Sequence, residues 1–545
     1  MIDFLLNLNL LQQVIIAVIP VILFLVLVNR LTTWEYIVPN EVQWIDRPQE
    51  GFGYLRAKAR SFSVMKENVM QAYLECNKKG RAAALAIAFG RPQIILPPKY
   101  IRWIIDQPES VLSMDPIHNE FHAFVQDGLV GDHSVQEVLR KELTQNLGRM
   151  TADINNEIVS ALDDIWGNSP EWKMIPLKDS TRTIIARITN RLFVGKDKCR
   201  NEDYIRSAVG LGMAVMPETV FQDLIPRPLK GPLSSVVKWI NHFYMAGFSR
   251  HLQPIVRERI QAVQQMEETA GKKGEDDMSE NPDQKLSSLP NDFLTWIVQR
   301  AVRRGESPAV IERRVIARVG MANLASIETT TNTMSKCLAD ITTLGEAQGY
   351  RALVTVEAHK VLRDCQNMPA KKDIEKLVHI ENALKESLRL AVVFPGLIRQ
   401  VTSPTGVTLE DGLHLPCGAR ISVAAYAIHR DDDIWPEAMT YNPARYESPQ
   451  TPADQTSAKT PSSRLPMSRA SESFLSFGLG KRACPGRFFV TDELKLLFAH
   501  MFTKYEIQII PVPPSKAGLF TELTLRGPQE HLLIRRRSEE NSVKA

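Results

Sequence analysis

Apolar residues along this chain follow helical spacing more often than strand spacing. Residues 4–28 are mostly apolar. At about 1.5 Å per residue, a helix of that length crosses the roughly 30 Å hydrocarbon layer of a bilayer. Apolar residues recur at helical spacing across 374–388, whereas strand patterns are short and lie around 406–409 and 421–427. The sequence therefore predicts a mainly α fold with small β-sheets, preceded by one N-terminal transmembrane helix.

The residues around segment 4–28 favour a retained anchor over a cleaved signal peptide. Asp3 precedes the apolar run without any Lys or Arg, and no A-x-A-like cleavage site follows it. Basic side chains beginning with Arg30 and Arg47 come after the run. By the positive-inside rule, we expect a single pass with the remainder of the chain in the cytosol.

Changes in composition divide the rest of the chain. Residues 29–51 contain prolines and are expected to form a stiff linker. Residues 52–538 are predicted to be one catalytic domain, because the motifs described below extend nearly to its end. Residues 539–545 form a polar tail. Two stretches poor in periodic apolar residues, 269–290 and 448–471, are expected to be exposed loops.

Charge and cysteine usage exclude several classes of protein. The 66 basic and 62 acidic residues give a net charge of +4, which is too balanced for a nucleic-acid-binding protein. The six cysteines contain no C-x-x-C pair, so neither a zinc site nor a disulfide framework is favoured. They are Cys76, Cys199, Cys337, Cys365, Cys417 and Cys484.

Cys484 lies in the segment Phe-Gly-Leu-Gly-Lys-Arg-Ala-Cys-Pro-Gly-Arg, residues 477–487. Helix-forming residues run from Arg487 to His500, so the thiol is expected just before a helix N-terminus, where amide dipoles favour an anionic sulfur. The glycines are expected to let the backbone approach a flat ligand closely. The competing interpretation, a buried structural cysteine in a glycine-rich turn, would hold for an isolated Cys-Pro-Gly.

The complete pattern F-G-x-G-x-R-x-C-x-G resembles that of the cytochrome P450 superfamily. The resemblance implies a cytochrome P450 fold and haem b, with Cys484 as the axial ligand of the iron. A thiolate ligand donates electron density to iron and favours cleavage of the O–O bond. Arg482 matches a position that binds a haem propionate. The remaining fixed positions of the loop are Phe477, Gly478, Gly480 and Gly486.

A second motif of the family is E-x-x-R, formed by Glu386 and Arg389 on one helical face. Taken alone, this motif is weak evidence for the family, because ion pairs three residues apart are common on protein surfaces. Residues 441–446 resemble the family's aromatic-x-Pro-x-Arg segment, which supplies Arg445. The resemblance implies that these three residues form a buried structural network that locks the segment leading to the Cys loop.

Residues 325–330, Ala-Ser-Ile-Glu-Thr-Thr, resemble the A-G-x-E/D-T-T motif of the family's long distal helix. The resemblance implies that Thr329 hydrogen-bonds oxygen and that Glu328 relays protons through water, with Ala325 and Ser326 beside them. The competing interpretation is a polar helix turn whose hydroxyls bond to backbone carbonyls. Ser326 replaces the usual glycine, which leaves the expected distortion of the helix in doubt.

Other positions near these motifs have weaker assignments. Arg399 matches a second propionate-binding position. Whether Arg140 is a third propionate-binding residue is left open, because Gln136 replaces the tryptophan that the family has before this arginine. The turn 392–397 is almost wholly apolar and projects over the haem in the family. The histidines His133 and His429 are predicted to be surface or helix-cap residues rather than metal ligands.

The motifs are most similar to those of fungal secondary-metabolism enzymes such as the ent-kaurene oxidases. We therefore expect a membrane-bound monooxygenase of the endoplasmic reticulum that oxidises a lipophilic terpenoid or indole-terpenoid. Electrons would come from NADPH through a separate reductase, or from a b-type cytochrome, since the chain has no G-x-G-x-x-G motif. The alternatives are a haem-thiolate isomerase or dehydratase and a membrane haem-binding protein without turnover.

Overall fold

The computed structural model describes residues 24, 37–47, 53–87, 90–119, 129, 131–224, 227–272, 289–392, 396–447, 465–510 and 531–538. The predicted span 4–28 lies outside these residues except for Phe24, as do about half of the linker, most of both predicted loops and the whole polar tail. None of the helices in the described ranges is long and apolar enough to cross a membrane. The chain folds as two compact units. The first comprises Met1–Ile117, Thr219–Val237 and Phe394–Ala427, and the second comprises His118–Glu218, Lys238–Val393 and Ile428–Ala545.

The first unit is built around a six-stranded sheet of order β1-β2-β3-β9-β6-β4. The strands β2, β3 and β9 are buried at every position, including the polar side chains of Gln93, Arg420 and Ser422. The strand pattern at 421–427 ends at Val423, because the next residues turn into a short helix. The elements are β1 (Gln43–Trp44), α3 (Gly53–Glu75), η1 (Asn77–Lys79), β2 (Ala83–Leu85), β3 (Gln93–Leu96), η2 (Pro98–Tyr100), α4 (Ile101–Asp106), β4 (Leu112–Ser113), α5 (Asp115–His118), β6 (Gly396–Val401), β7 (Val407–Thr408), β8 (His414–Leu415), β9 (Arg420–Val423) and α19 (Ala425–Ile428).

The second unit is mostly helical, as the sequence predicts, with one three-stranded sheet of order β10-β11-β5. Two further helices, α11 (Glu202–Leu224) and α12 (Arg227–Lys272), include residues of both units. The elements that lie wholly within the second unit are α7 (Ser134–Val138), η3 (Leu139–Leu143), α8 (Thr144–Ile165), β5 (Lys173–Pro176), α9 (Leu177–Phe193), α10 (Lys196–Cys199), α14 (Phe293–Arg303), α15 (Pro308–Ala347), α16 (Tyr350–Asp364), α17 (Lys371–Ile374), α18 (Val378–Ala391), η4 (Pro443–Tyr446), η6 (Gly480–Arg482), α21 (Arg487–Lys504), β10 (Tyr505–Ile510) and β11 (His531–Arg536).

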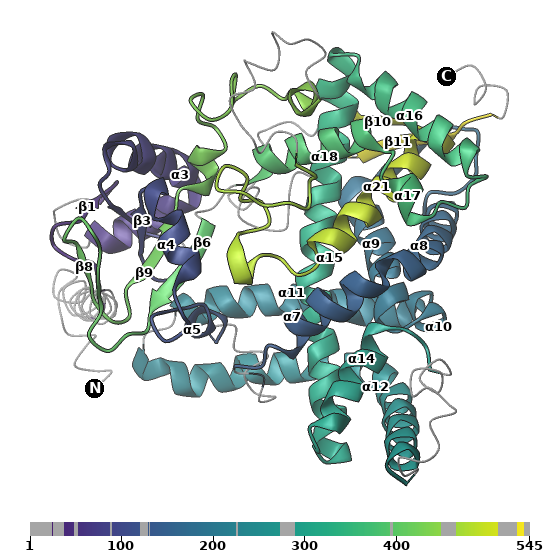
Figure 1. The fold of residues 1–545 in the computed structure, drawn as a ribbon, viewed down its shortest axis with the longest axis horizontal. Helices are drawn as coiled ribbons and strands as arrows, with labels where there is room; N and C mark the ends of the chain where they lie inside the picture. The colour runs from purple at the N-terminus through teal and green to yellow at the C-terminus, as the bar shows by residue number, and fades with distance from the viewer. Residues whose placement is uncertain are drawn as a thin grey trace, which may run out of the picture. The chain divides into compact units, whose positions relative to one another are not determined.

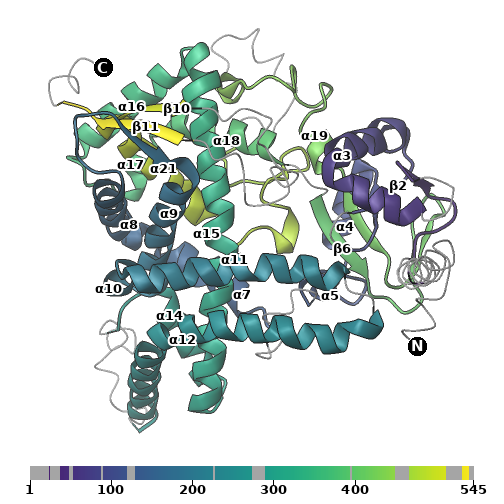
Figure 2. The same ribbon diagram turned by 180° about the vertical axis from the view of Figure 1, so that it is seen from behind.

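The long helix α15 organises the second unit (Figures 1 and 2). It begins at Pro308, in the first turn, where the missing N–H of proline removes no helical hydrogen bond. It ends before Gly349, which takes the left-handed conformation with φ of 72°. Along its 40 residues it packs against α9, α14, α16 and α18. Its neighbours α9 and α18 carry the polar groups of the candidate site.

The helix α18 carries the E-x-x-R motif and is held at its first turn by α16. The predicted helical stripe from 374 to 388 is two helices, because the backbone leaves helical geometry at Leu377. The Glu357 carboxylate of α16 then accepts the N–H groups of Val378, His379 and Ile380 at 2.8, 2.8 and 3.0 Å. A carboxylate at this end satisfies donors that have no partner within the helix.

Candidate active site

The loop before α21 presents Cys484 between the short helix η6 and the longer helix α21. The Cys484 amide donates to the carbonyl of Phe477 at 2.8 Å, and the Gly478 amide donates to the carbonyl of Leu475 at 2.9 Å. Gly478 and Gly480 have φ of 67° and 73°, a region that other residues rarely adopt. The backbone conformation of the loop therefore requires Gly478 and Gly480, independently of any bound ligand.

The Cys484 sulfur lies where the sequence predicts, just before a helix that begins at Arg487. Burial raises the pKa of the Cys484 thiol, while hydrogen bonds from the amides of Gly486 and Arg487 and the charge of Arg487 oppose that change. The net direction is upward. The amides at this helix start thus favour an anionic sulfur, as the sequence predicts, although the effect of burial is larger.

Guanidinium groups gather around the same loop. Arg140 Nη2 donates to the carbonyl of Lys481 at 2.6 Å, and Arg487 Nη1 donates to the carbonyl of Cys484 at 2.8 Å. Arg482 Nη1 lies 3.3 Å from Nδ1 of His133, which stands at the start of α7. Burial, and to a smaller extent the charge of Arg140, lowers the pKa of Arg487. The structure thus brings Arg140 into contact with the Cys loop.

Arg399, with Gly396 and Leu397 of the turn before it, belongs to the first unit, whereas Val392 and the Cys loop belong to the second. The Arg399 side chain is buried on β6, and Nη1 donates to the carbonyl of Ile398 at 2.8 Å. Of the predicted apolar turn 392–397, residues 393–395 lie outside the described residues. Leu397 is buried with φ of 56°, a strained value for leucine, at an irregularity in the pairing of β6 with β9.

The predicted catalytic residues of α15 occupy two sides of one uninterrupted helix. Ala325 and Thr329 are exposed and Ser326 is half-buried, whereas Glu328 is buried. The Thr329 hydroxyl donates to the carbonyl of Ala325 at 2.7 Å, as the competing interpretation of a polar helix turn predicts. A hydroxyl rotates freely, so this bond does not prevent Thr329 from serving a ligand on the same exposed face.

Glu328 is held by an arginine that sequence reasoning missed. Arg182 of α9 donates from Nε to Glu328 Oε1 at 2.5 Å and from Nη2 to Oε2 at 3.4 Å, and both side chains are largely buried. Arg182 also pairs with Asp179 at 2.8 Å and borders a cavity of about 510 Å³ between α8, α9, α10 and α11. The two partners of the buried pair are 146 residues apart, and no local pattern joins them.

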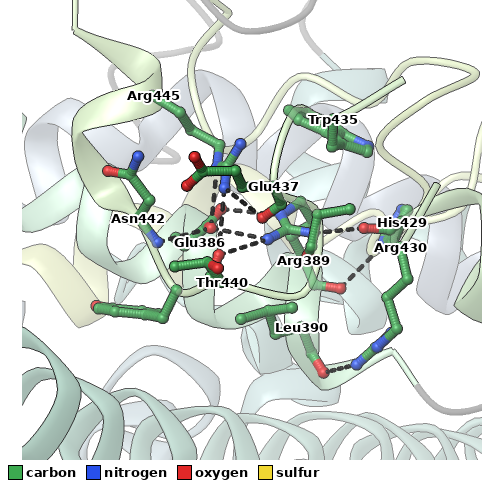
Figure 3. A network of polar contacts seen from close by, with 12 residues as sticks. Glu386, Arg389, Leu390, His429, Arg430, Trp435, Glu437, Thr440, Asn442 and Arg445 are labelled. Atoms are coloured by element: carbon green, nitrogen blue, oxygen red, sulfur yellow. Dashed lines mark hydrogen bonds and ion pairs between the residues drawn. The ribbon is translucent and has the colours of Figure 1, made fainter. Parts of the chain in front are cut away.

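The Glu386–Arg389–Arg445 network is buried, as the sequence predicts (Figure 3). Arg389 Nη2 and Arg445 Nε both donate to Glu386 Oε1, at 2.8 and 3.0 Å. The Tyr446 hydroxyl donates to Oε2 at 2.8 Å, and the Asn442 amide donates to Oε1 at 3.0 Å. Burial would raise the pKa of Glu386, but Arg389 and then Arg445 hold that pKa below its usual value. Arg389 also donates to the backbone carbonyls of His429, Ala438 and Thr440, so the network holds backbone from two distant segments.

His429 is buried, so the expectation of a surface position is wrong, whereas the alternative of a helix cap holds, because the ring bonds to a carbonyl in the last turn of α18. Its side chain is fully covered and stacks on Phe474 with ring planes 7° apart. Nδ1 lies 2.9 Å from the carbonyl of Arg389, and Nε2 accepts the amide of Leu475 at 2.8 Å. Burial, with the charges of Arg389 and Arg430, lowers the pKa of His429 to about 3. The imidazole is neutral in the folded chain.

Comparisons with known proteins agree on one family. A family model described as Cytochrome P450 matches residues 232–533. The chain is 63% identical to the cytochrome P450 monooxygenase ecdH of Aspergillus rugulosus, over 95% of this chain and 97% of that protein. It is 50% identical to the cytochrome P450 monooxygenase gloO of Glarea lozoyensis, over 94% of each. The crystal structure of a cytochrome P450DA heme domain is similar with a TM-score of 0.63 at 16% identity, covering 92% of this chain and 98% of that one.

Proposed function

Because this chain belongs to the cytochrome P450 family, we propose that Cys484 ligates the iron of its haem b and that the enzyme oxidises a lipophilic small molecule there. The chain is an oxidoreductase, and its similarity to fungal cytochrome P450 monooxygenases supports the insertion of one oxygen atom from O₂. The observation that carries the proposal is the Cys484 loop, where two backbone amides favour an anionic sulfur and Arg487 bonds to the carbonyl of Cys484.

The residues around the loop fit haem b. Cys484 offers the sulfur that this family uses as the axial ligand. The two haem carboxylates need cations, and Arg140, Arg482 and Arg487 all reach the loop. The side-chain oxygen of Gln136, one turn before Arg140, is buried with no hydrogen-bond partner among the described residues. Since amide orientation is interchangeable, the Gln136 side chain can instead offer an N–H to a carboxylate.

When bound, haem supplies the centre at which O₂ is activated. Of this chain's residues, Cys484 would hold the iron, and Phe477, Gly478, Gly480 and Gly486 would shape the loop around it. Arg482 and Arg399 are proposed to bind the haem carboxylates, with Arg140 as a third cation. The buried Glu386 network is proposed to keep the loop's approach fixed rather than to touch the reacting atoms.

We assign proton delivery to Glu328 and Thr329, on the α15 turn that also carries Ala325 and Ser326. Glu328 must leave Arg182 before its carboxyl group can pass a proton toward the exposed face of α15. Water in the 510 Å³ cavity that Arg182 borders would reach the Arg182 side of this ion pair. Thr329 Oγ1 is the hydroxyl that would donate to the ligand once it turns from the carbonyl of Ala325.

The proposed electron source is NADPH, through a separate flavoprotein reductase or a b-type cytochrome. The proposed location is the endoplasmic reticulum membrane, with segment 4–28 as a single span and the catalytic domain in the cytosol. The apolar sequence of that segment and the charges after it support this placement.

The proposed substrate is a rigid polycycle, a terpenoid or indole-terpenoid. The turn 392–397 supplies methyl groups and one aromatic ring but no charge. A pocket of that composition gains affinity mainly from apolar burial, at about 25 cal/mol per Å². A membrane anchor would also hold the pocket where lipophilic molecules partition.

The test is oxidation of a substrate panel by the full chain with a NADPH-dependent reductase. Terpenoid and indole-terpenoid skeletons should shift the haem iron from low to high spin, and their products should carry one atom of isotopically labelled O₂. Saturable shifts from charged metabolites alone would refute the substrate class. Unlabelled product formed without NADPH would instead identify an isomerase or dehydratase.

A further inference from the structure

The last turn of α18 is tied to the segment that leads into the Cys484 loop. Helix C-termini leave carbonyl groups without partners inside the helix. In α18 those carbonyls accept bonds from two distant segments. The Ser476 hydroxyl donates to the carbonyl of Leu388 at 3.1 Å, Arg430 donates to the carbonyls of Leu390 and Val392, and the ring of His429 bonds to the carbonyl between them.

Both ring nitrogens of His429 are hydrogen-bonded. The carbonyl of Arg389 only accepts, so the ring's Nδ1 must carry the proton. The Leu475 amide only donates, so Nε2 must keep its lone pair. The two partners thus fix a single neutral tautomer. Arg389 returns the contact, since its Nη1 donates to the carbonyl of His429 (Figure 3).

From Leu475, backbone hydrogen bonds continue to Cys484. The carbonyl of Leu475 accepts the amide of Gly478 at 2.9 Å and fixes the first turn of the loop. The carbonyl of Phe477, inside that turn, accepts the amide of Cys484 at 2.8 Å. Three consecutive hydrogen bonds therefore connect the ring of His429 to the backbone of Cys484. Phe474, the residue before Leu475, is itself stacked on the ring.

We propose that His429 is a positioning residue for the thiolate, a neutral hydrogen-bond bridge that transmits the position of the buried Glu386–Arg389–Arg445 network to the Cys484 loop. This inference rests on the proposed ligation of iron by Cys484. The groups facing the ring from its neighbours are Arg389 and Glu386 of α18, with Arg430 beside it in sequence. Each of the three is engaged in bonds of its own, so none replaces the imidazole between Arg389 and Leu475.

Three substitutions separate the two ends of the bridge from ring packing. His429→Phe keeps a ring against Phe474 and removes both hydrogen bonds. His429→Gln keeps a polar atom near the Nε2 position, toward Leu475, and His429→Asn keeps one near the Nδ1 position, toward Arg389. If the Leu475 bond holds the loop, the Gln variant should keep the thiolate better than the Asn variant. If the ring of His429 acted only by packing, the Gln and Asn variants should keep the thiolate equally well.

The matched control is His500→Phe. His500 is also buried and also neutral, because burial lowers its pKa to about 3, and its Nε2 bonds to Asn155 Oδ1 at 2.6 Å. It lies near the far end of α21 and makes no bond to the Cys loop among the described residues. Replacing it changes the same chemistry at a comparable depth without touching the bridge.

The experiment measures two quantities in the full chain. One is the fraction of reduced, CO-bound haem with the red-shifted Soret band of thiolate ligation, at equal haem content. The other is the hydrogen-exchange rate of the Leu475 amide in haem-free protein. We expect His429→Phe to lower the thiolate fraction by about half or more and to speed exchange about five- to tenfold, with His500→Phe changing neither.

Unchanged exchange and an unchanged band in His429→Phe would overturn the inference, as would equal losses in His500→Phe. If His429→Phe fails to fold, the thiolate fractions of the Gln and Asn variants decide: a fraction in His429→Gln that is no higher than in His429→Asn would overturn the inference. A wild-type spectrum without the thiolate band would contradict the proposed ligation, whereas the exchange rates would still judge the bridge.

Discussion

Thr329 is the residue whose proposed role can be separated from haem binding. Its hydroxyl lies on the exposed face of α15 and donates to the carbonyl of Ala325. Thr329→Ala should keep the thiolate spectrum but divert NADPH oxidation from product to hydrogen peroxide, because the hydrogen-bond donor is lost. Peroxide and product are measured against NADPH consumed. Unchanged coupling would assign the role to Ser326, Thr330 or ordered water instead.

Glu493 is a second residue whose chemistry is testable alone. It lies fully buried in α21, and neither carboxyl oxygen has a hydrogen-bond partner among the described residues. Burial raises its pKa well above the usual 4.5. The folded chain keeps the proton that the unfolded chain loses, so the stability of the fold falls as the pH rises above about 4.5, by up to about 1.4 kcal/mol per pH unit.

Glu493→Gln should therefore unfold at a higher temperature than the wild type, with an advantage that grows between about pH 5 and pH 8. Thermal unfolding of both proteins across this range measures the difference. Glu202→Gln, at an exposed position in the first turn of α11, is the control and should show no such growth. An advantage that is constant or shrinks with pH would mean that Glu493 has a partner in solution.

At the scale of elements, α18 joins the E-x-x-R network to the Cys loop, so the network's charge balance should govern stability. Glu386→Gln leaves Arg389 and Arg445 without their shared carboxylate and should lower the free energy of unfolding by about 3–5 kcal/mol. The control is Glu346→Gln. Glu346 pairs with Arg351 at 3.0 Å on the surface, and its loss should cost less than about 1 kcal/mol. Denaturant unfolding compares the two, and equal losses would contradict a structural role for Glu386.

The elements also mark how far the sequence could predict the site. The Cys484 loop and the helix after it could be predicted because their determinants are contiguous: two glycines at positive φ, then a helix from Arg487. The Arg182–Glu328 pair could not, since α9 and α15 meet only through tertiary packing. The burial of His429 could not be predicted, because its polarity suggests a surface and only the folded chain shows a partner at each ring nitrogen.

At the scale of the whole molecule, the mainly helical fold with small sheets is confirmed, and the membrane span stays a prediction. The full chain should resist carbonate extraction from membranes, whereas deletion of 4–28 should release much of the protein with its haem content kept. In sealed microsomes, the catalytic domain should be open to protease from the cytosolic side. Protection of that domain would reverse the proposed topology.

Ligation of the haem iron by Cys484 is tested most directly by the CO spectrum of the reduced, full-length protein. The wild type should show the red-shifted Soret band of a thiolate-bound haem, and Cys484→Ala should lose it. Cys417→Ala, which removes an exposed thiol elsewhere, should keep the band. A wild-type spectrum typical of histidine-ligated haem, or a Cys484→Ala protein that keeps the thiolate band, would contradict the assignment.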